Sequence, residues 1–490
     1  MADHQFELRH IESPQDVAAA SAIGALAYTG YKFFTNEGVA GNTEYLLNRI
    51  VPNKEKGTLG GVFANPSQHE LVKIKALVLA AADDEATKAA VVPTPGMVAF
   101  WGHNNYSVSL FGKDRKVGGL WFVSVGIASK KKGYAKALVL KYLGDCEERE
   151  QYLAALHPFR PDFYLKMGFG SSSPYYDYTV PPSAFPVSPR ASMSKSPLVT
   201  NKLDHTIDQL NVTDADSILA CRDRYSTVHH GMFRQDLADI KSYFSDKGAT
   251  LVFGAHDAER TLRGYLKLQF IPTELGKGVN DIKILEFIHE NAAALYALTR
   301  FLNQQSDQFR FVRLTTQDPD LYRLLEDPRT TGASRQVVGI HDAGHETAIQ
   351  STALMYRVVN VKKLFNDYFV DRDFNGVDGL KIVIYLDDSF TPSKNPPVLL
   401  EFTGGKARVT RVGSVSVDEA GKVVGRDISE EGVDAMLSIG VSHFSSLIIG
   451  AIGLKSLVVL GKAVLEPESL LKKVAKAFDV EDAPINTIHF

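Results

Sequence analysis

The sequence predicts a mixed α/β (α+β) chain of three domains, in which two α/β units of similar element order precede an α+β unit. The length of 490 residues exceeds what one hydrophobic core usually organises. The order strand, loop, helix, strand, helix occurs twice, in residues 119–167 and again in residues 282–325. The last part of the chain instead shows consecutive strands joined by short turns over about 130 residues, a normal domain size.

In the first unit, residues 119–125 are apolar on both faces, which predicts a central strand. The loop 126–132 and Gly133 lead into a helix whose apolar residues recur at helical spacing. The predicted elements that complete this unit are a strand at 152–156 and a short helix at 162–167.

The second and third units follow from the same patterns. In the second, we predict strands at 263–270, 282–287 and 311–315 and helices at 292–303 and 319–325. In the third, we predict strands at 381–386, 398–403, 406–412 and 414–417, with a hairpin turn at 403–406 and a helix at 467–478.

Two boundaries divide the chain. Residues 181–197 are rich in Pro and Ser, cannot hold a regular element, and read as a linker. A Gly, His and Thr cluster at 344–351 precedes the strand-like residues 353–359. The predicted domains are therefore 1–180, 198–345 and 350–490.

Composition excludes several classes of protein. The apolar fraction of 44% and charged fraction of 23% are those of a soluble globular protein, and a net charge of -3 gives no basic excess for nucleic acid. Cys146 and Cys221 lie far apart, which favours two free thiols over a disulfide. The first 20 residues lack the apolar core of a signal peptide. We expect a cytoplasmic protein without a membrane or nucleic-acid partner.

A basic loop before a helix is the sharpest feature. Residues 123–135 read VSVGIASKKKGYA, a strand that enters the loop, Lys130 to Lys132 and Gly133. The first N–H groups of a helix have no internal partner and carry partial positive charge, so this geometry attracts a pyrophosphate. Gly133 lets phosphates approach the backbone closely. The alternative is a solvated lysine run before an ordinary helix.

The loop resembles the coenzyme A signature of the GNAT acetyltransferases, Arg/Gln-x-x-Gly-x-Gly/Ala, as Lys130-x-x-Gly133-x-Ala135. Lys in place of Arg or Gln keeps charge but loses the planar fork. The resemblance implies acetyl-CoA as cosubstrate, with its pantetheine arm along Val123, Ser124 and Val125. It places the pyrophosphate among the residues that follow, Lys131, Lys132, Gly133, Tyr134, Ala135 and Lys136.

Residues 157–170, HPFRPDFYLKMGFG, resemble a motif of a narrower group, the enhanced intracellular survival (Eis) family. Its members join two GNAT-like domains to a sterol-carrier-protein-like (SCP2-like) domain, which matches all three units. The resemblance implies a homo-oligomer, with hexamers common in the family. Phe159 and Arg160 complete the predicted coenzyme site.

The same resemblance implies that Tyr164 is the general acid at the departing sulfur. A phenol has a pKa near ~10 and a thiol near ~8.5, so Tyr164 stays protonated beside a developing thiolate. The alternative is a buried aromatic residue beside Phe163.

The family's general base is the carboxylate of a C-terminal aromatic residue, here Phe490. A terminal carboxylate has a pKa of ~3.5, so we expect it to act through water or in a partly buried site. An ordinary chain end is the alternative. The predicted reaction is direct attack by an amine, and an acyl-enzyme on Cys146 is the competing mechanism.

The remaining units carry weaker signals. The second lacks the glycine and basic cluster and has Glu290 where phosphate would lie, so we expect a scaffold without coenzyme. The third resembles a lipid carrier, which makes lipid binding the main rival function; the apolar run 447–460 reads as core rather than as a cavity lining. His229, His230, His341 and His345 lack a third ligand, so we expect surface histidines and no metal site.

The acceptor is an amine on a small molecule, a peptide or a protein. In family members that acetylate aminoglycosides, acidic residues lie near the N-terminus and beside the last residue. Here Gly30 and His489 take those positions, which lowers the negative potential of the pocket. We therefore expect weak aminoglycoside activity and keep polyamines, peptides and protein lysines as candidates.

Overall fold

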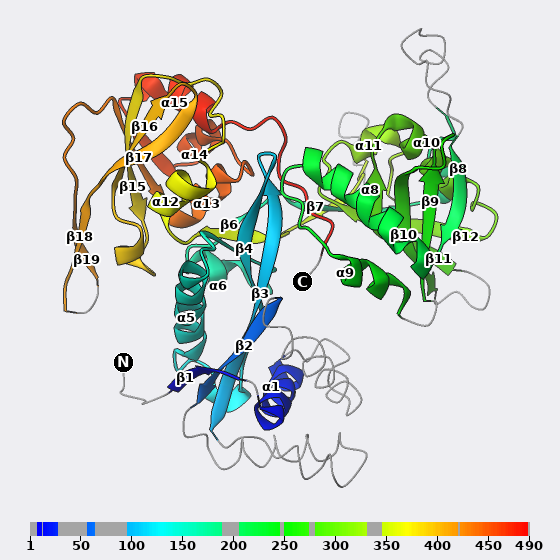
Figure 1. Cartoon of the computed structure of the whole chain (residues 1–490), viewed down its shortest axis with the longest axis horizontal. Coiled ribbons are helices and arrows are strands. Elements are labelled where there is room, and N and C mark those ends of the chain that lie inside the picture. The colour runs from blue at the N-terminus through cyan, green and yellow to red at the C-terminus, as the bar shows by residue number, and fades with distance from the viewer. Residues whose placement is uncertain are drawn as a thin grey trace, which may run out of the picture.

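The computed structural model describes residues 7–11, 13–27, 56–63, 96–188, 205–245, 249–273, 280–330, 345–419 and 422–488. Figure 1 shows three bodies, with the second (green) and third (yellow to red) on either side of the first (blue to cyan). One cluster of buried side chains joins them, because it includes Val108 and Tyr152 of the first, Phe233 of the second and Phe444 of the third.

The first domain is a seven-stranded sheet in the order β1-β2-β3-β4-β5-β14-β6. Helix α5 packs on it through Leu138, Val139 and Tyr142, the apolar stripe that the sequence predicts. Its strands are β1 (Glu7–His10), β2 (Gly57–Phe63), β3 (Met97–Leu110), β4 (Lys113–Val125), β5 (Leu153–Leu156), β6 (Gly170–Ser171) and β14 (Met355–Val358), and its helices are α1 (Pro14–Ala27), η3 (Ile127–Ser129), α5 (Tyr134–Glu148) and α6 (Pro161–Leu165).

The second domain has a sheet of the same size in the order β13-β7-β12-β11-β10-β9-β8. Helix α10 covers it in the way that α5 covers the first sheet. The strands are β7 (Tyr175–Val180), β8 (Thr206–Leu210), β9 (Thr250–His256), β10 (Leu262–Pro272), β11 (Asn280–His289), β12 (Phe309–Thr316) and β13 (Ile349–Ser351), and the helices include α8 (Ala215–Val228), α9 (Leu237–Lys241), α10 (Ala292–Asn303) and α11 (Leu321–Leu324).

The two sheets exchange strands across the predicted boundaries. β7 comes from the first segment but pairs with β12 in the second sheet. β14 begins the third segment but pairs with β5 in the first sheet. The sequence predicts a strand at 353–359 and makes no prediction for residues 175–180, and an alternating pattern does not say which sheet a strand joins. The division at 180 and 350 thus separates segments of chain, whereas the sheets interlock.

The third domain is a five-stranded sheet in the order β17-β16-β15-β20-β21 with a separate β18-β19 hairpin. Leu447, Leu454 and Leu457, in the apolar run 447–460, are buried in its core. Its strands are β15 (Leu380–Asp387), β16 (Val398–Thr403), β17 (Lys406–Val412), β18 (Ser414–Val417), β19 (Val423–Asp427), β20 (Ala435–Gly440) and β21 (Ala463–Glu466), and its main helices are α12 (Val361–Lys363), α13 (Val441–Ile448), α14 (Leu454–Val459) and α15 (Leu471–Phe478).

The predicted linker begins as packed structure. Pro182–Ala184 form a short 3-10 helix, and Ala184 and Phe185 are buried in the core of the second domain. The apolar residues between the prolines make these contacts. The remainder of the predicted linker, 189–197, lies outside the described residues.

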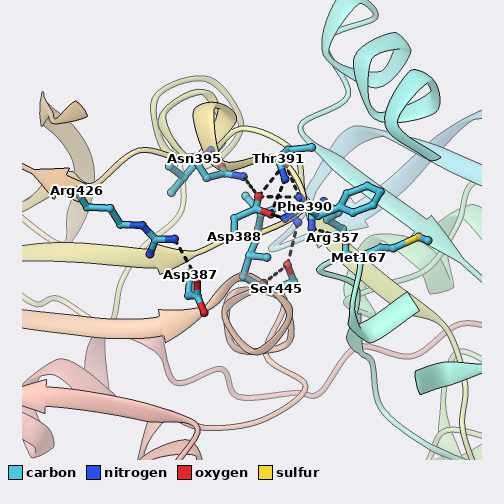
Figure 2. A network of polar contacts seen from close by, with 12 residues as sticks. Met167, Arg357, Asp387, Asp388, Phe390, Thr391, Asn395, Arg426 and Ser445 are labelled. Atoms are coloured by element: carbon cyan, nitrogen blue, oxygen red, sulfur yellow. Dashed lines mark hydrogen bonds and ion pairs between the residues drawn. The ribbon is translucent and has the colours of Figure 1, made fainter. Parts of the chain in front are cut away.

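A buried ion pair joins β14 to the third domain (Figure 2). Arg357 donates from Nη2 to Asp388 at 2.7 Å and to the Thr391 hydroxyl at 2.6 Å, and both charged side chains are fully buried. Nη1 of Arg357 donates to the carbonyl of Met167, in the turn after α6. Gly168 follows with φ +84°, and a Cβ there would overlap the guanidinium. Burying a charge demands such partners, so this network fixes α6 against β14.

Cys146 and Cys221 are free thiols, as predicted, and both are buried. None of the helices in the described part of the chain combines the length and apolar character needed to cross a bilayer.

Candidate functional site

A wedge opens between β4 and β5. Their parallel ladder runs from Val117 to Leu120 on β4 and stops there. Beyond that point the β3–β4 register shifts around Trp101, and Phe122 adopts φ +49°, a β-bulge that bends β4. β5 ends at Leu156, whereas β4 continues to Val125, so no β5 residue pairs with the end of β4, where the predicted loop and α5 begin.

A cleft of about 490 Å³ occupies this wedge. It brings together the predicted coenzyme residues except Ser124 and Lys132. Side chains alternate along a strand, so Val123 and Val125 face the cleft while Ser124 is buried behind them. The lining residues are Val123, Val125, Ser129, Lys130, Lys131, Gly133, Tyr134, Ala135, Lys136, Phe159, Arg160 and Phe163.

The loop leaves the start of α5 accessible. Lys131 and Gly133 have φ values of +62° and +88°, so the chain turns sharply before Tyr134. Gly133 is the N-cap and makes no side-chain cap bond, and the first turn of α5 carries no acidic residue. A Cβ at Gly133 would meet no heavy atom within 4 Å, so the space above the helix terminus is open. Such a terminus binds anions.

Cationic side chains surround the opening. Lys130, Lys131 and Lys132 are exposed, and no hydrogen bond or ion pair to another described residue engages their ammonium groups. Arg160 on the opposite wall is exposed and pairs with Asp162 at 2.6 Å. The lysines are therefore available for a polyanionic ligand, whereas the charge of Arg160 is already partly neutralised by Asp162.

Tyr164 lies behind the cleft wall. It is 3% exposed and packs edge-to-face on Phe159, Phe163 and Phe169, with ring centroids 6.0, 5.1 and 5.9 Å away. Phe159 and Phe163 line the cleft, but Tyr164 does not. It is thus one aromatic layer from the wedge.

The predicted base, Phe490, lies outside the described residues, as does His489. The chain is described to Ile488. Its last segment, red in Figure 1, leaves the third domain and passes between the first and second. Ile488 packs against the cluster of buried residues that joins the domains.

The competing nucleophile is not available. Cys146 lies near the end of α5 and is fully buried, and burial strongly raises the pKa of its thiol. A buried, protonated thiol is a poor nucleophile.

The second domain has a different helix start at the corresponding place. Asn291 caps α10 with its own side chain, which accepts from the Ala294 N–H at 2.9 Å. Glu290 beside it is paired with Arg224 at 2.6 Å and Arg263 at 3.4 Å. A self-capped terminus preceded by a carboxylate offers little to a phosphate.

No group of three or more His, Cys, Asp or Glu side chains that could hold a metal ion occurs among the described residues. His230, predicted to lie at the surface, is only partly exposed. Its ring accepts from the Phe111 N–H at 3.2 Å and lies 2.8 Å from the Ile449 carbonyl, so it links the three domains. No motif or spacing in the sequence indicated this packing role.

Replacing Lys131 by Ala together with Gly133 by Asp should weaken acetyl-CoA binding by about 100-fold or more, because it places a carboxylate where the pyrophosphate belongs. Titration calorimetry measures the loss. The matched control is Lys113→Ala with Gly112→Asp: Gly112 also has a positive φ and open space, but lies at the far end of β4. Similar losses in both variants would contradict the assignment of the loop.

Two protein-family models match parts of the chain. Residues 83–172 match an acetyltransferase (GNAT) domain family, and residues 229–346 match a second such family. No curated protein matches the chain.

Three solved structures share the fold over the whole chain. A probable N-acyltransferase of Enterococcus faecalis is 14% identical with a TM-score of 0.69, and a GCN5-related N-acetyltransferase of Anabaena variabilis is 14% identical with a TM-score of 0.68. Eis1 of Mycobacterium abscessus is 14% identical with a TM-score of 0.64. Each alignment covers 99% of this chain and 100% of the other. The chain is an acyltransferase with two tandem GNAT domains.

Proposed function

We propose that this acyltransferase transfers the acetyl group of acetyl-CoA to an amine by direct attack in the wedge of the first domain. The observation that carries the proposal is the cleft between β4 and α6, which gathers the basic loop, the accessible start of α5 and an apolar channel. A pyrophosphate fits the loop, and a slender pantetheine arm fits between Val123 and Phe163.

The residues divide the chemistry between them. Lys130, Lys131 and Lys132 and the N–H groups at Gly133 to Lys136 hold the pyrophosphate. Backbone groups from Val123 to Val125 accompany the pantetheine and stabilise the oxyanion. The amine loses its proton to the Phe490 carboxylate through water. Tyr164, which lies behind Phe159 and Phe163, donates a proton to the departing sulfur once these rings move aside. The new amide bond forms as the thioester bond breaks.

The third domain is proposed to be SCP2-like and to deliver the chain end rather than to carry lipid. The burial of Leu447, Leu454 and Leu457 in the core supports this division, because a lipid cavity would need those side chains on its wall. The full-length likeness to Eis1 supports an Eis-type organisation with domains 1–180, 198–345 and 350–490. A homo-oligomer and a cytoplasmic location complete the proposal.

The proposal for the acceptor rests on the sequence alone, because Gly30 and His489 lie outside the described residues. The two departures from acidic residues there favour polyamines, peptides or protein lysines over aminoglycosides.

Free-thiol release from acetyl-CoA with a panel of amines tests the proposal. The panel contains spermidine, lysine-rich peptides, a basic protein and an aminoglycoside. We expect thiol release with at least one of the first three and little with the fourth. If no amine supports release and the purified protein retains lipid at one molecule per chain, lipid carriage replaces acetyl transfer.

A further inference from the structure

The second domain repeats the wedge of the first. Strands β11 and β12 are parallel, and their ladder stops at Ile284 and Leu314. The β10–β11 register shifts at the same level, so that Leu285 is an extra residue. A bulge followed by the end of a parallel ladder also occurs at β4 and β5. In the second domain this arrangement leaves a gap beside Glu286.

The chain's own C-terminal segment fills this second wedge. A cavity of about 70 Å³ remains there, walled by β11 and β12 on one side and by Ile485, Asn486 and Thr487 on the other. Ile485 packs against a core cluster of the second domain, and Asn486 is 5% exposed. The position that a coenzyme arm takes in the first domain is thus taken by peptide in the second.

Backbone hydrogen bonds hold the segment. The Ile485 N–H donates to the His230 carbonyl at 2.8 Å, and the Asn486 N–H donates to Gln317 Oε1 at 2.6 Å. Gln317 is itself oriented, because its Nε2 donates to the Ser173 carbonyl at 2.5 Å. The Asn486 side chain closes a turn by donating to the Ile488 carbonyl and accepting from its N–H.

A buried polar cluster forms hydrogen bonds with the next residue, Thr487. The Thr487 hydroxyl donates to Glu286 Oε1 at 2.7 Å and accepts from Arg222 Nη1 at 3.1 Å. Arg222 and Glu286 form an ion pair with side chains 1% and 4% exposed. The hydroxyls of Tyr265 and Tyr243 donate to the second oxygen of Glu286 at 2.8 and 2.9 Å.

Glu286 is held ionised by these partners. Burial alone would raise its pKa, but Arg222 and the hydroxyls of Thr487 and Tyr265 outweigh that effect and lower the pKa. A charge-assisted hydrogen bond to a buried carboxylate is stronger than one to a neutral acceptor. The cluster therefore gives the segment a defined register at Thr487.

We propose that the wedge of the second domain is a peptide-docking site for residues 485–488, and that Thr487 on Glu286 fixes the distance to the chain end. Phe490 is three positions beyond Thr487, and three residues of extended chain span at most about 11 Å. The catalytic consequence of the docking rests on the proposed function; the docking itself does not.

Thr487→Val in the full chain tests the register, because it removes one hydroxyl and leaves the Arg222–Glu286 pair intact. Two readouts separate docking from catalysis: hydrogen exchange of the C-terminal peptide, and steady-state kinetics. We expect exchange of the amides at 485–488 to accelerate about tenfold or more. We expect kcat to fall about tenfold or more while KM for acetyl-CoA stays within about twofold. Thr487→Ser restores the hydroxyl and should restore both.

The matched control is Thr227→Val, which removes a hydroxyl from α8 of the same domain that bonds only to Asp223 and Arg234. It should change neither readout. Unchanged exchange in Thr487→Val would overturn the docking site. Accelerated exchange with unaltered kcat would overturn the positioning role. Accelerated exchange in an enzyme that acetylates no amine would leave docking in place and remove the proposed function instead.

Discussion

Tyr164→Phe should lower the turnover of acetyl-CoA with an accepted amine by about 10²- to 10⁴-fold, the usual contribution of a general acid. The departing thiolate then loses its proton donor. Affinity for acetyl-CoA should change by less than about twofold, because phenylalanine keeps the ring that packs on Phe159, Phe163 and Phe169. Single-turnover kinetics and calorimetry measure the two quantities.

The burial of Tyr164 makes a control necessary. Tyr142 lies in the same core cluster, and its hydroxyl donates to the Gly118 carbonyl at 2.7 Å. Tyr142→Phe should cost about 1 kcal/mol of stability without a selective effect on turnover. If Tyr164→Phe reduces turnover and coenzyme affinity by the same factor, Tyr164 is a packing residue and the acid lies elsewhere.

Most of the residues predicted to contact the coenzyme line one cleft, because they belong to consecutive elements of the chain. A strand, a loop and a helix that are consecutive in the chain meet at Gly133, and their side chains face the same cleft. Periodicity therefore identifies both the elements and the residues that face inward. Residues 292–303, 398–403 and 406–412 also form their elements with the predicted bounds.

The orientation of the side chains on α6 could not be predicted from the local sequence. The helix has only five residues, too few for a helical period to define a face. The pattern could not show that Phe163 lines the cleft while Tyr164 lies behind it. Ser129 was missed for the same reason, because loop residues carry no periodic signal.

Contacts between residues that are distant in the chain could not be predicted from the sequence, for a different reason. The entry of β14 beside β5 depends on which edge is open in the folded first domain, and no local pattern encodes that choice. The docking of Thr487 on Glu286 joins residues 201 positions apart. A buried carboxylate within an apolar strand, as in ILEFI at 284–288, is the one available signal, since buried charges need partners.

We propose that the two GNAT domains use the same wedge for different ligands. Bulges at Phe122 and Leu285 open both sheets at the same level. In the first, an uncapped helix start and free lysines favour phosphate; in the second, Asn291 caps the helix and Glu286 presents a carboxylate to the Thr487 hydroxyl. The side chains around a duplicated gap, rather than the gap itself, decide what enters it.

An extension of four residues beyond Phe490 should lower turnover by about 10²-fold or more, because the carboxylate moves away and a peptide bond takes its place. Acetyl-CoA affinity should stay within about twofold, since the basic loop and α5 are untouched. The same extension at the N-terminus is the control for added chain. Protein ligation can also install Phe490 as an amide, which removes the charge without adding bulk.

The extended chain and the Phe490 amide distinguish the effect of losing the terminal charge from the effect of added bulk. If both lose turnover, the terminal charge is required, in agreement with a base delivered by the segment that docks at Thr487. If the amide is active and the extended chain is not, the end of the chain must fit the pocket but does not accept the proton. If both forms turn over like the unmodified enzyme, the base is a side chain, and docking of the segment serves only to join the domains. A pH profile of kcat distinguishes the first case further, since the amide should lose the acidic limb that ionisation of the carboxylate imposes.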